Sequence, residues 1–133
     1  MTPLEIARNL HAFCKTFDGK YLYGGGHGPP LSKITVHQGL DCSSSVSRAL
    51  YHNGLLGSTT AQVSDWFETW GARGRGKYVT VHATDDHVWV EFTLPEGWSR
   101  FDTSPHGSGG FGPRVRSGRR SDGRFVHRHP PGL

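Results

Sequence analysis

The stretch YVTVHATDDHVWVEF, residues 78–92, decides the fold class of this chain. Apolar and polar residues alternate over 78–82 and again over 87–92, and this period of two is typical of β-strands. Asp85 and Asp86 lie between the two runs and predict a tight turn, because aspartate favours turn conformations. We therefore expect two strands joined by this turn.

Further strands are expected downstream. Pro-Glu-Gly at 95–97 predicts a turn into a strand over 99–102. A last strand is expected over 125–128, and it ends before Pro130 and Pro131.

Upstream, apolar residues recur at helical spacing. A first helix is expected from Pro3 to about Thr16, with Thr2 as N-cap and Glu5 completing a capping box. Its end is followed by a short extended piece at 21–23 and by a long, glycine-rich loop.

Two more helices are expected before the strands. One begins near residues 41–42 and stops at Asn-Gly 53–54, and the other runs from a cap at 58–60 to Gly71. The basic, glycine-rich segment 72–76 is expected to be a turn. Helices followed by antiparallel strands predict an α+β fold, with N-terminal helices packed on a mostly antiparallel sheet.

The chain, residues 1–133, has the length of one domain and is too short for two. It contains no run of eighteen apolar residues and no charged-then-apolar leader, so we expect neither a membrane span nor a signal peptide. The domain is therefore expected to belong to a larger chain or to reach its substrate by another route. We expect it to be a monomer.

Positive charge is concentrated at the C-terminal end. The formal net charge is +4. Six arginines lie in the last twenty residues: Arg114, Arg116, Arg119, Arg120, Arg124 and Arg128. A basic tail of this kind favours an anionic partner, although it is also compatible with a merely solvated surface. Because interleaved aromatics, a zinc-finger pattern and a helix-turn-helix signature are all missing, we expect no nucleic-acid partner.

The two cysteines lie in different settings. Cys14 falls on the apolar face of the first helix and is expected to be buried packing. Cys42 falls in the first turn of the second helix, where free N–H groups and the helix dipole stabilise a thiolate. The same N–H groups can stabilise an oxyanion. Taken alone, Asp-Cys-Ser at 41–43 also fits a small buried cysteine near a cap.

A cysteine nucleophile needs an imidazole base within reach. His87 opens a predicted strand just after a turn, which is a rigid position for such a base. Asp102, on the next strand, is the candidate to orient the imidazole, and His106 is the alternative. Since the chain has nine histidines, His87 could instead be structural, and Asp102 could be a turn former at a strand end.

Three motifs follow one another from Tyr21 to Asp102: Tyr21-x-Tyr23-Gly24-Gly25, then Leu40-Asp41-Cys42-Ser43-Ser44-x-Val46, then His87-Val88-x-Val90. In order and spacing they resemble the NlpC-type (NlpC/P-sixty) cell-wall cysteine peptidases. The C-terminal part, including 101–107, is similar to a subgroup found in actinobacteria and their phages.

The resemblance implies a papain-like α+β fold. It also implies hydrolysis of the peptidoglycan stem peptide, in the bond between γ-linked D-glutamate and diaminopimelate, at the cell wall. Carried across by position, Cys42 is the nucleophile, His87 the base and Asp102 the third polar residue. The chain would act outside the cell, or be delivered by a phage particle or a larger parent protein.

The resemblance also implies substrate-binding residues. Tyr21 would lie beside the nucleophile, and Asp41 and Ser43 would hold the free amine and backbone of the stem peptide. The basic tail would then hold the enzyme near an acidic wall.

The sequence departs from the family pattern at three places. Ser44 stands where the family often has glycine, and Asp102 stands where it often has histidine. The long insert at 26–39 precedes the nucleophile where substrate should enter, which leaves the cleavage specificity open.

No metal and no cofactor are expected. HExxH and CxxC patterns are absent, and His127 with His129 in a flexible tail would be a poor ligand pair. Two alternatives to the peptidase remain. One is an N-acetylmuramoyl-L-alanine amidase on a related papain-like scaffold. The other is a non-catalytic wall-binding module that uses the basic tail and four tryptophans, Trp66, Trp70, Trp89 and Trp98.

Overall fold

The first helix begins as the sequence predicts. In the computed structural model, which describes residues 1–104 and 110–133, α1 runs over Pro3–Cys14. The Thr2 hydroxyl accepts a hydrogen bond from the Glu5 N–H at 3.1 Å, and the Glu5 carboxylate accepts one from the Thr2 N–H at 3.0 Å. These two bonds complete the expected capping box.

The helix α2, Cys42–His52, begins with a second capping box. Asp41 Oδ1 accepts a hydrogen bond from the Ser44 N–H at 2.9 Å, and Ser44 Oγ accepts one from the Asp41 N–H at 3.1 Å. Because the box fixes the first turn of α2, it also fixes the position of Cys42.

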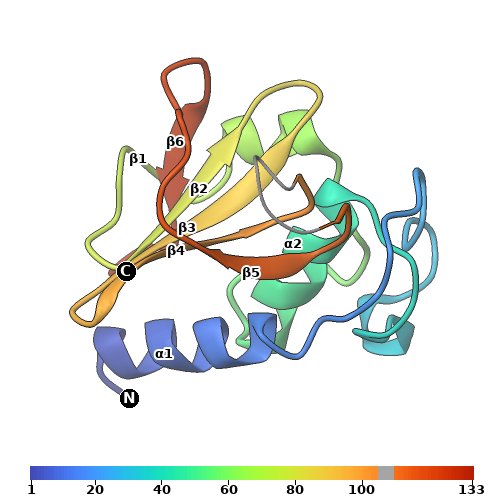
Figure 1. Ribbon diagram of the computed structural model, residues 1–133, viewed down its shortest axis with the longest axis horizontal. Helices are drawn as coiled ribbons and strands as arrows, with labels where there is room; N and C mark the ends of the chain where they lie inside the picture. The colour runs from blue at the N-terminus through green and yellow to red at the C-terminus, as the bar shows by residue number, and fades with distance from the viewer. Residues whose placement is uncertain (105–109) are drawn as a thin grey trace.

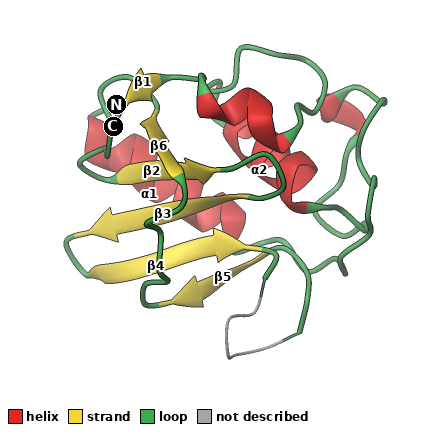
Figure 2. Cartoon of the chain, turned by 90° about the horizontal axis from the view of Figure 1, so that it is seen from above, coloured by secondary structure: helices red, strands yellow, loops and turns green. Residues whose placement is uncertain are grey.

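In the described residues, six strands form one antiparallel sheet in the spatial order β1-β6-β2-β3-β4-β5 (Figures 1 and 2). Their bounds are β1 Ala72–Arg73, β2 Val79–Ala83, β3 Val88–Leu94, β4 Gly97–Asp102, β5 Arg114–Ser117 and β6 Val126–His129. The expected pairing of 78–82 with 87–92 is confirmed, with Val81 opposite Val90. β4 pairs with the other side of β3.

Both faces of this sheet are buried. The helices α1 and α2 lie on one face (Figures 1 and 2), where apolar side chains of β2 and β3 join the core. The other face is covered by the segment 118–125 between β5 and β6, whose Phe125 ring lies 5.7 Å from that of Trp89, centroid to centroid. Polar residues of the central strands are therefore enclosed as well, and His82 and Glu91 are 0% and 1% exposed.

The prediction of a third helix is wrong. Only a short 3-10 helix, η2 over Ser64–Glu68, forms within the predicted span 58–70. Before it, the Ser58 hydroxyl accepts a hydrogen bond from the Thr60 N–H at 3.3 Å, and Thr60 forms a β-bridge with Pro30. Local side-chain bonds of this kind satisfy the backbone in a non-helical conformation, which explains why the helix does not start there.

Two edge strands were not predicted. The segment expected to be a turn, 72–76, contains β1, which pairs with β6. β5 reads Arg-Val-Arg-Ser, and its single apolar residue gives too little alternation to predict a strand. The expectation of a flexible C-terminal tail is also wrong, because His127 and His129 lie on β6 within the sheet.

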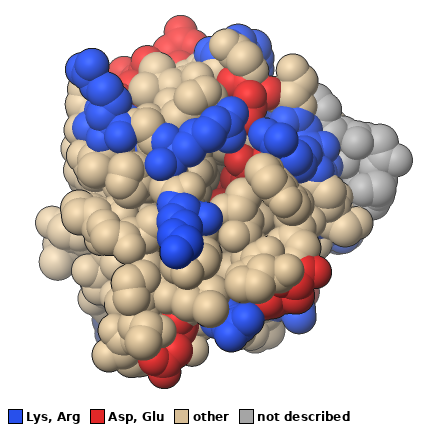
Figure 3. All heavy atoms as spheres, turned by 90° about the vertical axis from the view of Figure 1, so that its left-hand side faces the viewer, with Lys and Arg blue, Asp and Glu red and all other residues tan. Residues whose placement is uncertain are grey.

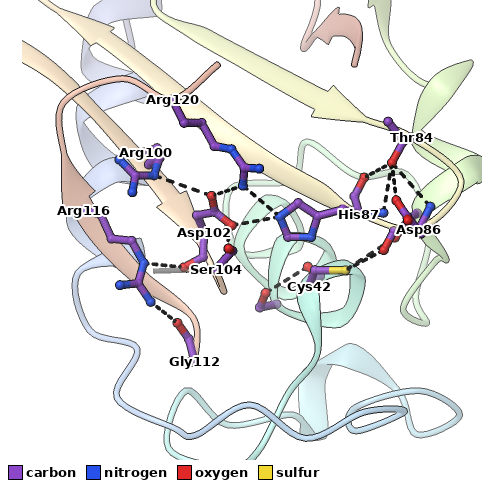
Figure 4. A network of polar contacts seen from close by, with 12 residues as sticks. Cys42, Thr84, Asp86, His87, Arg100, Asp102, Ser104, Gly112, Arg116 and Arg120 are labelled. Atoms are coloured by element: carbon purple, nitrogen blue, oxygen red, sulfur yellow. Dashed lines mark hydrogen bonds and ion pairs between the residues drawn. The ribbon is translucent and has the colours of Figure 1, made fainter. Parts of the chain in front are cut away.

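The α+β class, with helices followed by antiparallel strands, is confirmed. Across the described ranges, the helices are too short and too polar to cross a membrane. The sheet and α2 together place the start of the helix beside the β2–β3 turn, and the candidate site lies there (Figure 4).

Candidate active site

Cys42 is the first residue of α2, and its side chain faces the sheet. It is 8% exposed, with Sγ 3.5 Å from Ser64 Oγ and 4.0 Å from the main-chain oxygen of Asp86 (Figure 4). The thiol is therefore nearly enclosed, yet it borders an open pocket and lies beside the free N–H groups of the helix start.

His87 lies in the turn just before β3. Thr84 holds this turn, because its N–H donates to the His87 carbonyl at 2.8 Å and its hydroxyl accepts from the His87 N–H at 3.2 Å. The ring of His87 lies between the Asp102 carboxylate and the Cys42 side chain (Figure 4). Its Nε2 is 2.9 Å from Asp102 Oδ1, which leaves Nδ1 for the thiol.

Asp102 ends β4 and is 2% exposed. Besides His87, its Oδ1 accepts a hydrogen bond from the Ser104 N–H at 3.0 Å, and its Oδ2 accepts one from Arg120 Nη1 at 2.7 Å. The structure thus brings Asp102 to His87 as the sequence predicts. The alternative residue, His106, lies outside the described residues.

The environment favours a charged thiolate–imidazolium pair. Burial by itself would raise the pKa of Cys42, but hydrogen bonding to His87 and Ser64 and the charge of His87 outweigh it and lower that pKa. Burial would lower the pKa of His87, whereas hydrogen bonds and charge from Asp102 and Cys42 raise it to about 9. Both directions correspond to a proton moved from sulfur to imidazole.

The carboxylate of Asp102 stays ionised despite its burial. Desolvation opposes its charge, but hydrogen bonding to His87, together with the Ser104 N–H and Arg120, lowers its pKa. An ionised Asp102 can hold the His87 ring in one orientation and stabilise its protonated form.

A pocket of about 410 Å³ opens beside the sulfur. Tyr21, Asp41 and Ser43, the residues implied to bind substrate, all line it. Tyr21 is 38% exposed, whereas Asp41 and Ser43 are 8% and 5% exposed. The pocket therefore contains every predicted substrate residue together with the nucleophile.

Asp41 has a larger structural role than the sequence indicates. Besides capping α2, it accepts hydrogen bonds from the Gly24 N–H at 3.2 Å and the Ser43 hydroxyl at 3.2 Å. Its Oδ1 also lies 3.0 Å from His27 Nε2. Asp41 thus ties the glycine-rich loop to the start of α2.

Three residues of the site were not predicted from the sequence: His27, Ser64 and Arg120. His27 lies in the loop 24–28, in the pocket wall, with its Nε2 3.1 Å from Ser43 Oγ. No spacing rule connects this loop to a helix start. The glycine run was a partial signal, because a Cβ added at Gly26, where φ is +81°, would lie 2.8 Å from Ser44 Cβ.

A second buried cluster lies on the outer face of the sheet. His82, Glu91 and Asp122 place possible ligand atoms within 4.8 Å of one another. However, Arg75 and Arg119 each form ion pairs with both Glu91 and Asp122. These guanidinium groups neutralise the carboxylates, so the cluster is better suited to holding the chain together than to binding a cation.

The C-terminal arginines do not form a separate basic tail. Arg116 is 5% exposed and donates to the main-chain oxygen of Asp102 at 3.1 Å, and Arg128 donates to the carbonyl of Trp70 at 2.7 Å. On the face shown in Figure 3, blue basic groups are separated by red acidic and tan groups. This end of the chain contributes to the site and the sheet.

Comparisons with protein-family models, with curated proteins and with solved structures find no match for this chain. A function is therefore inferred from the site's own geometry and from the sequence motifs.

Proposed function

We propose that this chain is a cysteine peptidase with a papain-like fold that cuts peptidoglycan stem peptides. The observation that carries the proposal is the adjacency of Cys42, His87 and Asp102, which come from α2, the turn before β3 and the end of β4. The lowered pKa of Cys42 and the raised pKa of His87 support a reactive thiol, since a merely structural cysteine needs no such pairing.

The proposed reaction has two steps. The Cys42 thiolate attacks the amide carbon, and the free N–H groups at the start of α2 stabilise the oxyanion. The carbon–nitrogen bond then breaks as the His87 imidazolium gives its proton to the leaving amine. Neutral His87 next takes a proton from water, which attacks the thioester and releases the carboxylic product and the thiolate.

The choice of substrate depends on the resemblance to NlpC-type peptidases. That resemblance favours cleavage of the bond between D-glutamate and diaminopimelate. The pocket supports a peptide substrate, because the Asp41 carboxylate and the Ser43 hydroxyl meet in its wall. No metal or cofactor has a part in the proposed mechanism.

Digestion of purified peptidoglycan, followed by mass analysis of the fragments, tests the proposal. We expect new glutamate carboxyl and diaminopimelate amine ends, lost in Cys42→Ala while the melting temperature is kept. A freed lactyl group on the glycan would instead indicate the amidase. No release of fragments by the wild-type chain would contradict both enzymes.

The wall-binding module has less support. Trp89 is 0% and Trp70 is 8% exposed, so neither can present its ring to a polymer. Trp98 is 45% exposed, but the Arg119 guanidinium lies over its ring at 4.1 Å. A non-catalytic module would also not require the contact between Cys42 and His87.

A further inference from the structure

Arg120 comes from the segment 118–125, which covers the outer face of the sheet. Its side chain is only 7% exposed. The guanidinium carbon lies 5.2 Å from the Trp89 ring centroid and 5.3 Å from that of Phe125. Aromatic packing on this scale holds the guanidinium in place.

The guanidinium reaches two members of the proposed site. Arg120 Nη1 lies 2.7 Å from Asp102 Oδ2 and 3.3 Å from His87 Nε2 (Figure 4). When His87 Nε2 carries a proton toward Asp102, it cannot also accept one from Arg120. When both nitrogens of His87 are protonated, two positive groups lie side by side and share one carboxylate.

The charged groups around His87 come from several elements. Cys42 faces it from α2, Asp102 from β4, Asp86 from its own turn and Arg120 from the segment after β5. Behind Asp102, Arg100 Nε lies 3.5 Å from Oδ2. Arg116 binds the main-chain oxygen of Asp102. Asp102 is therefore shared between His87 and an arginine that is not one of the three proposed catalytic residues.

We propose that Arg120 is a positioning residue that aligns Asp102 with His87 and offsets the attraction of Asp102 for a protonated His87. This role rests on the proposed function. Its consequence is chemical, because an imidazolium held too firmly by a carboxylate gives its proton to a leaving amine less readily. Arg120 keeps Asp102 ionised while it weakens the attraction between Asp102 and the protonated His87 ring.

The sign of the expected shift follows from the charges. Removing the positive charge of Arg120 leaves Asp102 ionised at alkaline pH, since His87 and the Ser104 N–H still bind it. The imidazolium then loses a repulsive neighbour at 3.3 Å, so His87 should keep its proton to higher pH.

The test follows the ring signal of His87 by NMR during a pH titration of the intact chain. In Arg120→Gln we expect the midpoint to rise by on the order of one pH unit. In Arg120→Lys, which keeps the charge, it should stay near the wild-type value. Arg128→Gln is the control, because Arg128 is also partly buried but its hydrogen bonds go to main-chain oxygens at 69–71, so it should leave the midpoint unchanged.

Melting temperatures show that each variant is folded, and Arg120→Met replaces the glutamine variant if that one does not fold. A wild-type midpoint in Arg120→Gln or Arg120→Met would overturn the proposal, as would an equal shift in Arg128→Gln. The titration needs no wall substrate. If the His87 midpoint shifts as expected but the chain releases no peptidoglycan fragments, the proposed function is contradicted, whereas the effect of Arg120 on the protonation of His87 is not.

Discussion

At the scale of single residues, the two cysteines show how surroundings decide reactivity. Cys14 is fully buried at the end of α1, and burial raises its pKa. Cys42 is almost as enclosed, but its pKa is lowered by hydrogen bonding to His87 and Ser64 despite that burial. A thiolate is the reactive form, so the difference should be visible in simple chemistry.

We expect iodoacetamide at neutral pH to label Cys42 well before Cys14 in the folded chain, by at least roughly tenfold in rate. Peptide mapping by mass spectrometry measures both sites in one sample. The matched control is the unfolded chain in urea, where the two rates should converge. Equal rates in the folded chain would contradict an activated thiol.

The pH dependence of hydrolysis should reflect the protonation of the Cys42–His87 ion pair. Activity needs His87 protonated, so kcat/KM should fall as pH rises through about 9, the raised pKa of His87. It should also fall at acid pH, where the Cys42 thiolate takes up a proton, and that limb should lie below the ordinary range of a thiol because the pKa of Cys42 is lowered. A loss of activity on the alkaline side that is centred near pH 6.5, the ordinary value for histidine, would show that the pair does not form.

Asp102 should be needed as a carboxylate. Oδ1 accepts from His87 and Ser104, and Oδ2 accepts from Arg120, so an amide would turn an N–H donor toward one of these donors. We expect Asp102→Asn and Asp102→Ala both to lose roughly a hundredfold in kcat. His106→Ala should lose less.

The surface pair of Asp18 with His37, 2.7 Å apart and largely exposed, provides the control. Asp18→Asn should leave the rate unchanged, although it removes the same kind of contact. Near-normal turnover in Asp102→Asn would mean that the residue only orients the ring and that its charge is dispensable.

At the scale of the elements, the start of α2 supports both stability and the site. The N-cap residue Asp41 binds the helix through Ser44 and the loop through Gly24. The same carboxylate meets His27 in the wall of the pocket. One substitution should therefore affect both folding and turnover.

We expect Asp41→Ala to lower the free energy of unfolding by about 1–2 kcal/mol, the usual cost of an N-cap, and also to reduce hydrolysis. Thr2→Ala removes the equivalent cap from α1, away from the pocket, and should cost a similar amount of stability with normal hydrolysis. Urea unfolding and wall digestion measure the two effects. Normal hydrolysis in Asp41→Ala would limit Asp41 to a structural role.

At the scale of the whole molecule, the C-terminal segment acts as a cover for the sheet. It carries Arg119, Arg120 and Phe125 onto the outer face, where Glu91 accepts from His82, Arg75 and Arg119. A carboxylate that is 1% exposed and has three cationic or polar partners is costly to disturb. We expect this network to fix the cover that carries Arg120.

Glu91→Gln should therefore destabilise the chain by about 1–3 kcal/mol, because a buried amide cannot accept all the hydrogen bonds that the carboxylate accepts from His82, Arg75 and Arg119. Urea unfolding measures the loss. Glu96→Gln is the control, since Glu96 pairs with Arg8 at 2.9 Å on the exposed surface and should matter little. A similar, small effect in both variants would show that the cover is held by packing alone.

The sequence alone determined the local features of this protein. Capping boxes depend on residues three positions apart, and strand alternation depends on neighbours, so α1, α2 and the pairing of β2 with β3 were predictable. The same held for Cys42 at a helix start and His87 at a strand start. Asp102 was proposed as the polar residue on the next strand, and the resemblance to a family added Tyr21, Asp41 and Ser43 to the expected site.

Only the tertiary structure decided what covers the sheet and what completes the site. β5 and the segment 118–125 carry too few apolar residues to predict their place on the sheet, and Arg119 and Arg120 hold that segment there by pairing with the buried carboxylates of Glu91 and Asp102. The contacts of His27 with Asp41 and of Arg120 with Asp102 join residues far apart in the chain. No local pattern encodes such contacts, because they depend on how the folded sheet, loop and helix start meet in space.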